Sequence, residues 1–117
     1  MSGQDFVLNG FSQFQIAGNL CPPSGQDRLV VEKTKNGISM VKFNIEVKTY
    51  DSKNKQEKFT YVPITCFSFE ADRLGQYGKL NSYYVVTGNV NGRVVKTQNG
   101  EFDAVDLVAN QVLAGSK

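Results

Sequence analysis

Histidine is absent from this 117-residue sequence, and cysteine occurs only twice. Without histidine, the chain cannot form a Ser-His-Asp arrangement, the usual zinc ligand sets or the most common general base. Cys21 and Cys66 are far apart and lack CxxC spacing, which is typical of two reduced thiols rather than of a disulfide framework. We therefore predict no metal site, no catalytic residues and no cofactor.

Motifs for phosphate-binding loops and for membrane insertion are also missing. Neither GxxxxGKS/T nor GxGxxG occurs. No apolar run approaches the roughly 20 residues that cross a bilayer, and the segment MSGQDFVLNG lacks the regions of a secretory signal. Glu70 and Asp72 lie two residues apart and would not face each other on a helix, so they suit its first turn better than catalysis. We expect a cytoplasmic protein that is neither an enzyme nor bound to a membrane.

The residues that are present indicate a folded, β-rich protein. Hydrophobic residues make up 40% of the chain, including eight phenylalanines and five tyrosines, which is unlike a disordered sequence. The length suits one domain whose core needs no disulfides. We predict a single domain over residues 1–117, in which residues 1–10 form an N-terminal extension that could be mobile.

Asn-Gly pairs divide the chain into alternating segments. They begin at Asn9, Asn36, Asn91 and Asn99, and this dipeptide is a strong hairpin signal because both positions tolerate positive φ. Strands are predicted over residues 11–20, 38–50, 59–67, 82–96 and 101–113, with an extended arm at 28–35. The polar stretch DSKNKQEK, residues 51–58, is predicted to be a mobile loop because it contains no apolar anchor.

One segment lacks alternation and predicts a short helix. SFEADRLGQYG begins with Ser68 as a candidate N-cap and contains Gly75 and Gly78 as candidate ends. Five strands with one helix between the third and fourth give the element order of an OB-fold, a five-stranded Greek-key barrel. Gly18 and Gly88 fall inside predicted strands, where glycine marks the bends or close backbone approaches that barrel closure needs.

Alternation assigns the strand side chains to two faces. The apolar inner face of strands 38–50 and 59–67 carries Val41, Phe43, Ile45, Val47, Val62, Ile64 and Cys66. Their outer face carries Lys42, Asn44, Glu46, Lys48, Tyr50, Tyr61, Pro63, Thr65 and Phe67. Strand 82–96 points Tyr84, Val86 and Val90 inward and Tyr83, Val85, Asn89, Asn91 and Arg93 outward. Because proline cannot donate to a ladder, Pro63 could mark a bulge that inverts the faces beyond it.

An outer face that interleaves aromatic rings with cations suits single-stranded nucleic acid. Every base has a π-face that can stack on an exposed ring, and lysine and arginine bind phosphates. The net charge is only +2, but residues 28–58 contain eight Lys or Arg against four Asp or Glu. The predicted binding surface comprises Tyr50, Tyr61, Phe67, Tyr83, Lys42, Lys48, Lys53, Lys55, Lys58, Arg93 and Lys96.

Four stretches carry a resemblance to a known family. IAGNL, KNGISMVKFNIEV, FSFEADRLGQYGKLNSYYVVTGNV and VDLVANQVL resemble the bacterial and phage single-stranded DNA-binding proteins. The matching positions are Gly18, Asn19, Leu20, Asn36, Gly37, Phe67, Ala71, Asp72 and Gly88. The resemblance covers residues 11–113. It implies an OB-fold that binds single-stranded DNA without sequence preference in replication, recombination or repair, and that stacks bases on Tyr50, Tyr61 and Phe67.

The chain departs from the family's pattern in several ways. Val94, Val95 and Lys96 stand where the family has a stacking ring between its last two strands. The sequence ends in LAGSK, without the acidic tail that recruits repair and replication partners, which favours a phage-type member. The absence of tryptophan predicts weaker binding than in relatives that contain it.

The resemblance also concerns partners. It implies a homo-oligomer, a dimer or tetramer, for which FSQFQIAGNL could provide an edge, and replication or recombination proteins bound other than through an acidic tail. Two alternatives stay open: an OB-fold accessory protein of replication restart or recombination that works through protein contacts, and a structural subunit whose tyrosines are buried against a partner.

Overall fold

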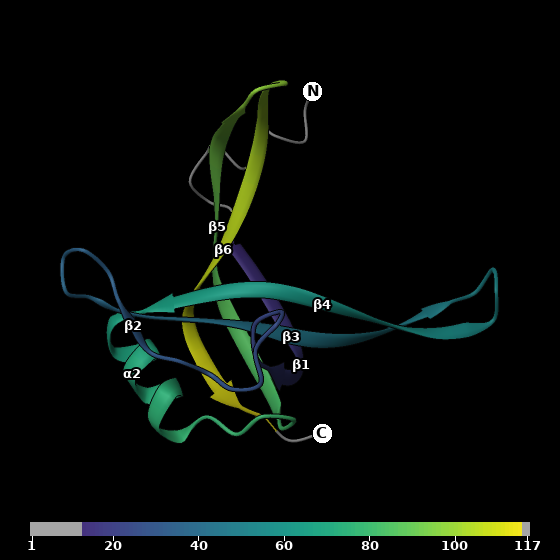
Figure 1. Cartoon of the computed structure of the whole chain (residues 1–117). Helices are drawn as coiled ribbons and strands as arrows, with labels where there is room; N and C mark the ends of the chain where they lie inside the picture. Colours follow the sequence, from purple (N-terminus) through teal and green to yellow (C-terminus); the bar gives the residue numbers. More distant parts are fainter. Residues whose placement is uncertain (1–12, 116–117) are drawn as a thin grey trace.

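The computed structural model describes residues 13–115, which form one closed sheet and a helix (Figure 1). The elements are β1 (Gln13–Cys21), β2 (Glu32–Lys33), β3 (Ser39–Asp51), β4 (Gln56–Phe67), α2 (Ser68–Tyr77), β5 (Tyr83–Thr97) and β6 (Gly100–Ala114). The strand order is β1-β5-β6-β4-β3-β2, and a further β1–β3 pairing closes the barrel. The predicted OB-fold is confirmed, with the two-residue β2 added to the five expected strands. Residues 1–10, predicted as an extension, lie outside the described part.

The inner face predicted from alternation forms the core. Val41, Phe43 and Ile45 on β3 are buried together with Ile64 and Cys66 on β4. Burial of a side chain of this size contributes about 1.5–3 kcal/mol, so this set dominates the stability of the barrel. The same alternation extends to β5, where Tyr84 and Val86 are buried as predicted and Val90 is half-buried.

The ladder between β3 and β4 keeps one register from Met40 opposite Phe67 to Asp51 opposite Gln56. The bulge expected at Pro63 is therefore absent, and Phe67 stays on the face predicted for it. Pro63 keeps its place in this ladder, opposite Asn44, and β6 pairs with β4 only at Thr65 and Cys66.

The prediction of a loop over residues 51–58 is wrong, because β3 and β4 extend into a two-stranded arm that leaves only residues 52–55 as a turn. The Asp51 carboxylate accepts hydrogen bonds from the backbone N–H groups of Lys53 and Asn54, at 3.0 and 3.3 Å. Lys55 adopts a φ of 52°. An aspartate that bonds the backbone two residues on stabilises a tight turn, so this polar segment folds as a hairpin.

A second two-stranded arm is formed by β5 and β6, and it projects from the barrel in another direction (Figure 1). The Asn99-Gly100 prediction is confirmed, since Gly100 has a φ of 125° beside the turn. The Asn36-Gly37 turn is also confirmed, with Gly37 at φ 79°. Asn91-Gly92 is not a turn; both residues pair with β6 inside β5. Asn9 lies outside the described residues.

Two smaller predictions also need correction. The extended arm expected over residues 28–35 is reduced to β2, which pairs with β3 through Glu32 and Lys33 only. Ser68 is not the N-cap of α2: Phe67 occupies that position without a side-chain cap, and Ser68 has a left-handed φ of 59°. An N-cap serine would instead be extended.

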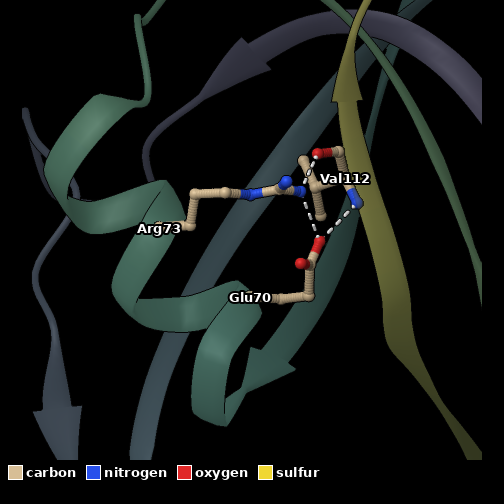
Figure 2. Close-up of polar contacts among 3 residues, drawn as sticks. All are labelled: Glu70, Arg73 and Val112. Atoms are coloured by element: carbon tan, nitrogen blue, oxygen red, sulfur yellow. Dashed lines mark hydrogen bonds and ion pairs between the residues drawn. The ribbon is translucent and has the colours of Figure 1, made fainter.

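The helix is attached to the barrel by the ion pair between Glu70 and Arg73, whose side chains form hydrogen bonds with the backbone of Val112 on β6 (Figure 2). The Glu70 carboxylate accepts the N–H of Val112 at 2.9 Å, and the Arg73 guanidinium donates to the carbonyl of Val112 at 2.8 Å. Glu70 and Arg73 also bond each other at 2.8 Å. The two side chains thus satisfy backbone groups that another strand would otherwise pair with, and charge-assisted bonds of this kind are stronger than neutral ones.

Gly18 and Gly88 mark close backbone approaches, as predicted: Gly18 lies beside the β1–β3 closure, and Gly88 lies at a register shift between β5 and β6. A Cβ on Gly18 would collide with the backbone carbonyl of Glu46, and one on Gly88 with that of Val108. Both positions therefore require glycine for close approach of the strands.

A search of residues 13–115 for a helix with the length and apolar character of a membrane span found none.

Candidate nucleic-acid interface

The outer face of β3 and β4 presents the predicted aromatic rings to solvent. Tyr50, Tyr61 and Phe67 are 64%, 54% and 37% exposed. Residues paired across an antiparallel ladder share a face, and the pairs Tyr50–Glu57, Glu46–Tyr61 and Met40–Phe67 place all three rings on one side of the two strands. The structure thus brings together three rings that come from two strands.

Phe59 is a fourth ring on this face that the sequence analysis did not include. It lies opposite Lys48 and is 52% exposed. Its position two residues before Tyr61 is the signal that could have identified it, because alternate strand residues share a face. The rings fall into two groups: Tyr50 and Phe59 on the projecting arm, and Tyr61 and Phe67 nearer the barrel.

A pocket of about 280 Å³ lies on the same face, next to the rings. Its lining includes Lys42, Asn44, Pro63 and Thr65 from β3 and β4, Pro23 and Ser24 from the segment after β1, and Val105, Asp106 and Leu107 from β6. In OB-folds the face of the second and third long strands, flanked by such connections, binds oligonucleotides and oligosaccharides. The pocket therefore lies where this fold places ligands.

Asn44 shows how the flanking segment changes the outer face. Alternation predicts it to point outward, yet only 7% of it is exposed. The residues after β1 cover it, and its side-chain amide donates to the carbonyl of Pro22 at 3.3 Å. Asn44 thus helps to hold that segment over the wall of the pocket.

Glu46 connects three strands at the centre of the face. The Tyr61 hydroxyl donates to its Oε2 at 2.9 Å, and the side-chain amide of Asn19 donates to its Oε1 at 3.3 Å. The hydrogen bond to Glu46, with the charge of that carboxylate, raises the pKa of the Tyr61 phenol. The pKa of the nearby Cys21 thiol is also raised, mainly by burial and to a smaller extent by the charge of Glu46. The other thiol, Cys66, lies in the core, where burial raises its pKa to about 12.

The comparison with known families agrees with this geometry. A model of the single-strand binding protein family matches residues 11–114. The chain belongs to this family. A search for curated relatives found no match. The single-strand binding protein family is a non-catalytic, DNA-binding family with an OB-fold, so the chain is a single-stranded DNA-binding protein.

The predicted lysines of β3, β4 and the turn of this single-strand binding protein lie in four settings. Lys42 is exposed beside the pocket and has no ion-pair partner within 4.0 Å among residues 13–115. Lys48 pairs with Glu57 at 3.0 Å, with both side chains 57% exposed. Lys53 and Lys55 are exposed in the turn of the β3–β4 arm. Lys58 lies opposite Thr49, so it points to the other side of the arm from the rings.

The remaining predicted residues lie on β5. Tyr83 is half-buried. It pairs with Asn19, Asn19 pairs with Glu46, and Glu46 pairs with Tyr61, so Tyr83 lies at the β5 end of this row of cross-strand pairs. Arg93 bonds Asp106 at 2.7 Å, and the Nζ of Lys96 lies 3.9 Å from Glu101. Both cations are thus paired with acids of β6: Arg93 bonds Asp106, which lines the pocket, whereas Lys96 lies near the turn of the β5–β6 arm and is not brought together with the aromatic face.

Proposed function

We propose that this protein binds single-stranded DNA, without sequence preference, on the outer face of β3 and β4. Bases stack on Tyr50, Phe59, Tyr61 and Phe67. The observation that carries the proposal is this set of exposed rings on one face with an unbroken register. Stacking on an aromatic ring contributes about 1–3 kcal/mol per base and tolerates any sequence.

Phosphates are bound in this proposal by lysines around the same face. Lys42 lies beside the pocket, and Lys53 and Lys55 extend from the turn of the arm. Lys48 is paired with Glu57, but an exposed pair of this kind contributes little stability and can exchange its partner for a phosphate. Lys58, Tyr83, Arg93 and Lys96 have secondary roles, because they lie on another face, are half-buried or are paired with acids.

The biological role follows from the same activity. We place the protein in DNA replication, recombination or repair, in the cytoplasm of a bacterial cell or of a phage-infected host, as a homo-oligomer. Single strands exposed in these processes have no fixed sequence, so a binding face without base-edge readout is suitable for them.

A second candidate is an OB-fold accessory protein that works mainly through protein contacts. Exposed rings away from the proposed DNA face favour it: Phe69 and Tyr77 on α2 are 72% and 68% exposed. Both rings belong to the same helix, and exposed apolar side chains of this size occur at protein-binding surfaces. This role would add to the DNA-binding face or replace it as the main activity.

A salt-dependent titration tests the proposal. The protein is added to a labelled thymidine homopolymer at several salt concentrations, binding is followed by fluorescence anisotropy, and light scattering gives the mass of the complex. The logarithm of the affinity should fall with the logarithm of salt at about −0.7 per bound phosphate. Other single-stranded homopolymers should bind similarly. A flat salt response, or a preference for duplex, would contradict the proposed function.

A further inference from the structure

We propose that Glu46 is a positioning residue that holds the Tyr61 ring ready for stacking; this inference rests on the proposed function. Glu46 lies on β3, between Asn19 of β1 and Tyr61 of β4, and it pairs with both in the sheet. Each of its carboxylate oxygens accepts one of the two hydrogen bonds described above. The three side chains form a row across three strands.

The ring of Tyr61 needs such a restraint because it is 54% exposed. A side chain that is free to rotate loses conformational entropy when a ligand orders it, typically about 0.5–1.5 kcal/mol for each side chain immobilised at an interface. A hydroxyl already bonded to a fixed acceptor reduces that loss. Glu46 is suited to this role because it is half-buried in the middle strand and is itself held by Asn19.

The charge of Glu46 supports the same conclusion. A carboxylate on a surface that binds phosphates opposes binding through repulsion. Glu57, on the same face, is neutralised by Lys48 at 3.0 Å. Glu46 has no cation within 4.0 Å among the described residues, and its partners are the neutral donors Asn19 and Tyr61. Its presence on this face is therefore explained by the hydrogen bonds that it accepts.

The Glu46 carboxylate also affects which path a bound DNA strand can take across this face. Because it repels phosphates, a bound strand should place its backbone toward Lys42 and the turn lysines and its bases toward Tyr61. The hydrogen bond to Tyr61 is the effect that the proposal assigns to Glu46, and it requires no contact between Glu46 and DNA.

A double-mutant cycle on Glu46 and Tyr61 tests the inference, with binding to a thymidine homopolymer as the readout. Tyr61→Phe removes the hydrogen bond alone and should weaken binding about two- to tenfold, the fold-change that corresponds to ordering one side chain. Glu46→Ala removes the same bond but also relieves repulsion of phosphates, so it should weaken binding by no more than Tyr61→Phe does. The double variant should bind no more weakly than the weaker single variant, because both changes remove the same interaction. Additive losses, or normal binding by Tyr61→Phe, would overturn the proposal.

Three matched variants distinguish a positioning role of Glu46 from an effect of its charge and from a purely structural role. Glu46→Gln keeps an acceptor for the hydroxyl and should recover most of the affinity lost in Glu46→Ala. Glu57→Gln removes a carboxylate from the same face without touching Tyr61, and it should not weaken binding. Asn19→Ala breaks only the bond to β1 and should cost less than Glu46→Ala. Equal losses in Asn19→Ala and Glu46→Ala, with Tyr61→Phe unaffected, would assign Glu46 to a structural clamp instead.

Titration of the phenol gives a readout that DNA binding does not influence. The difference in ultraviolet absorbance between the protein and its Tyr61→Ala variant isolates the ionisation of Tyr61. In Glu46→Ala its pKa should fall toward the ordinary tyrosine value, since the carboxylate that raises it is gone. An unchanged pKa would mean that the hydrogen bond does not form in solution.

The same series distinguishes the two proposals. If the unmodified protein does not bind single-stranded DNA, the proposed function fails. If it binds and Tyr61→Ala weakens it, but the cycle is additive, only the role of Glu46 fails. Thermal unfolding of each variant confirms that loss of binding does not come from loss of the fold.

Discussion

Two arms project from the barrel (Figure 1). Both are two-stranded, and their net charges have opposite signs. Residues 48–60, the β3–β4 arm, contain four lysines and two acids, a net charge of +2. Residues 91–106, the β5–β6 arm, contain two basic residues and three acids, a net charge of −1. Each arm exposes at least one phenylalanine: Phe59 is 52% and Phe102 is 53% exposed.

Because both arms expose rings, the charge beside the rings is what distinguishes them as candidate nucleic-acid surfaces. On the β3–β4 arm, Lys53 and Lys55 are exposed in the turn, next to a face with several rings. On the β5–β6 arm, both cations are paired with acids of the opposite strand. A phosphate approaching the second arm meets a net negative charge, which Coulomb repulsion disfavours. The proposed binding mode therefore places DNA on the first arm.

The largest expected effect concerns the core that supports both arms. Ile64→Ala removes a buried side chain from β4 and should destabilise the protein by about 2–5 kcal/mol through the cavity it leaves. The affinity of the remaining folded fraction for single-stranded DNA should be nearly unchanged. Denaturant unfolding and a binding titration at the same temperature measure the two quantities. Loss of binding without loss of stability would show that the two faces are inverted.

The next largest effect concerns the exposed rings, which should matter for binding on the β3–β4 face but not on the β5–β6 arm. Tyr61→Ala and Phe59→Ala should each weaken binding roughly ten- to hundredfold, the affinity that corresponds to removing one ring from the stack. Phe102→Ala is the matched control on the other arm and should change affinity less than about twofold, because no base stacks there in the proposed binding mode. All three are surface changes and should leave unfolding nearly unaffected. A loss of affinity in Phe102→Ala as large as in Phe59→Ala would remove the distinction between the arms.

Charge gives a smaller, graded effect. Replacing both Lys53 and Lys55 by alanine should reduce the steepness of the salt dependence by about 1.4, because each phosphate that is no longer neutralised lowers the slope by about 0.7. Lys96→Ala should leave the slope unchanged, because Lys96 lies on the β5–β6 arm, whose net charge is negative. Binding isotherms at several salt concentrations provide the slopes. An equal decrease in both variants would place phosphates on both arms.

Protease protection should sharpen the comparison without any substitution. Trypsin should cut the free protein after Lys53 and Lys55, which are exposed in a turn, and an oligonucleotide should slow both cuts. Cleavage after Lys96, on the other arm, should be slowed less. Mass spectrometry of the early fragments measures each rate. Equal rates at Lys53 with and without DNA would argue against binding at this arm.

Much of the barrel was predictable from local pattern. Val41, Phe43 and Ile45 alternate with polar residues, and in a half-buried sheet the period of two determines which of them enter the core. The same period placed Tyr50, Tyr61 and Phe67 outside. Gly37 and Gly100 could be assigned to turns because they adopt φ values that glycine reaches most easily. These features depend on neighbours in the chain.

Other features depended on residues far apart in the sequence. Asn91-Gly92 has the dipeptide of a turn but stays in a strand, because β6 pairs with it. Asn44 alternates outward but is buried, because Pro22 and its neighbours cover it. The row of Asn19, Glu46 and Tyr61 exists only because barrel closure brings β1 beside β3.

The sequence by itself therefore determined the OB-fold, the two faces of its strands and most rings of the proposed DNA surface, since each follows from local periodicity and side-chain type. Only the tertiary structure decided which charges act there. Pairing across β5 and β6 places acids beside Arg93 and Lys96, while the hairpin leaves Lys53 and Lys55 at its turn, next to the face with the rings. The physical reason is that the effect of a charge depends on distances to groups on other strands, and the chain sets those distances only when it folds.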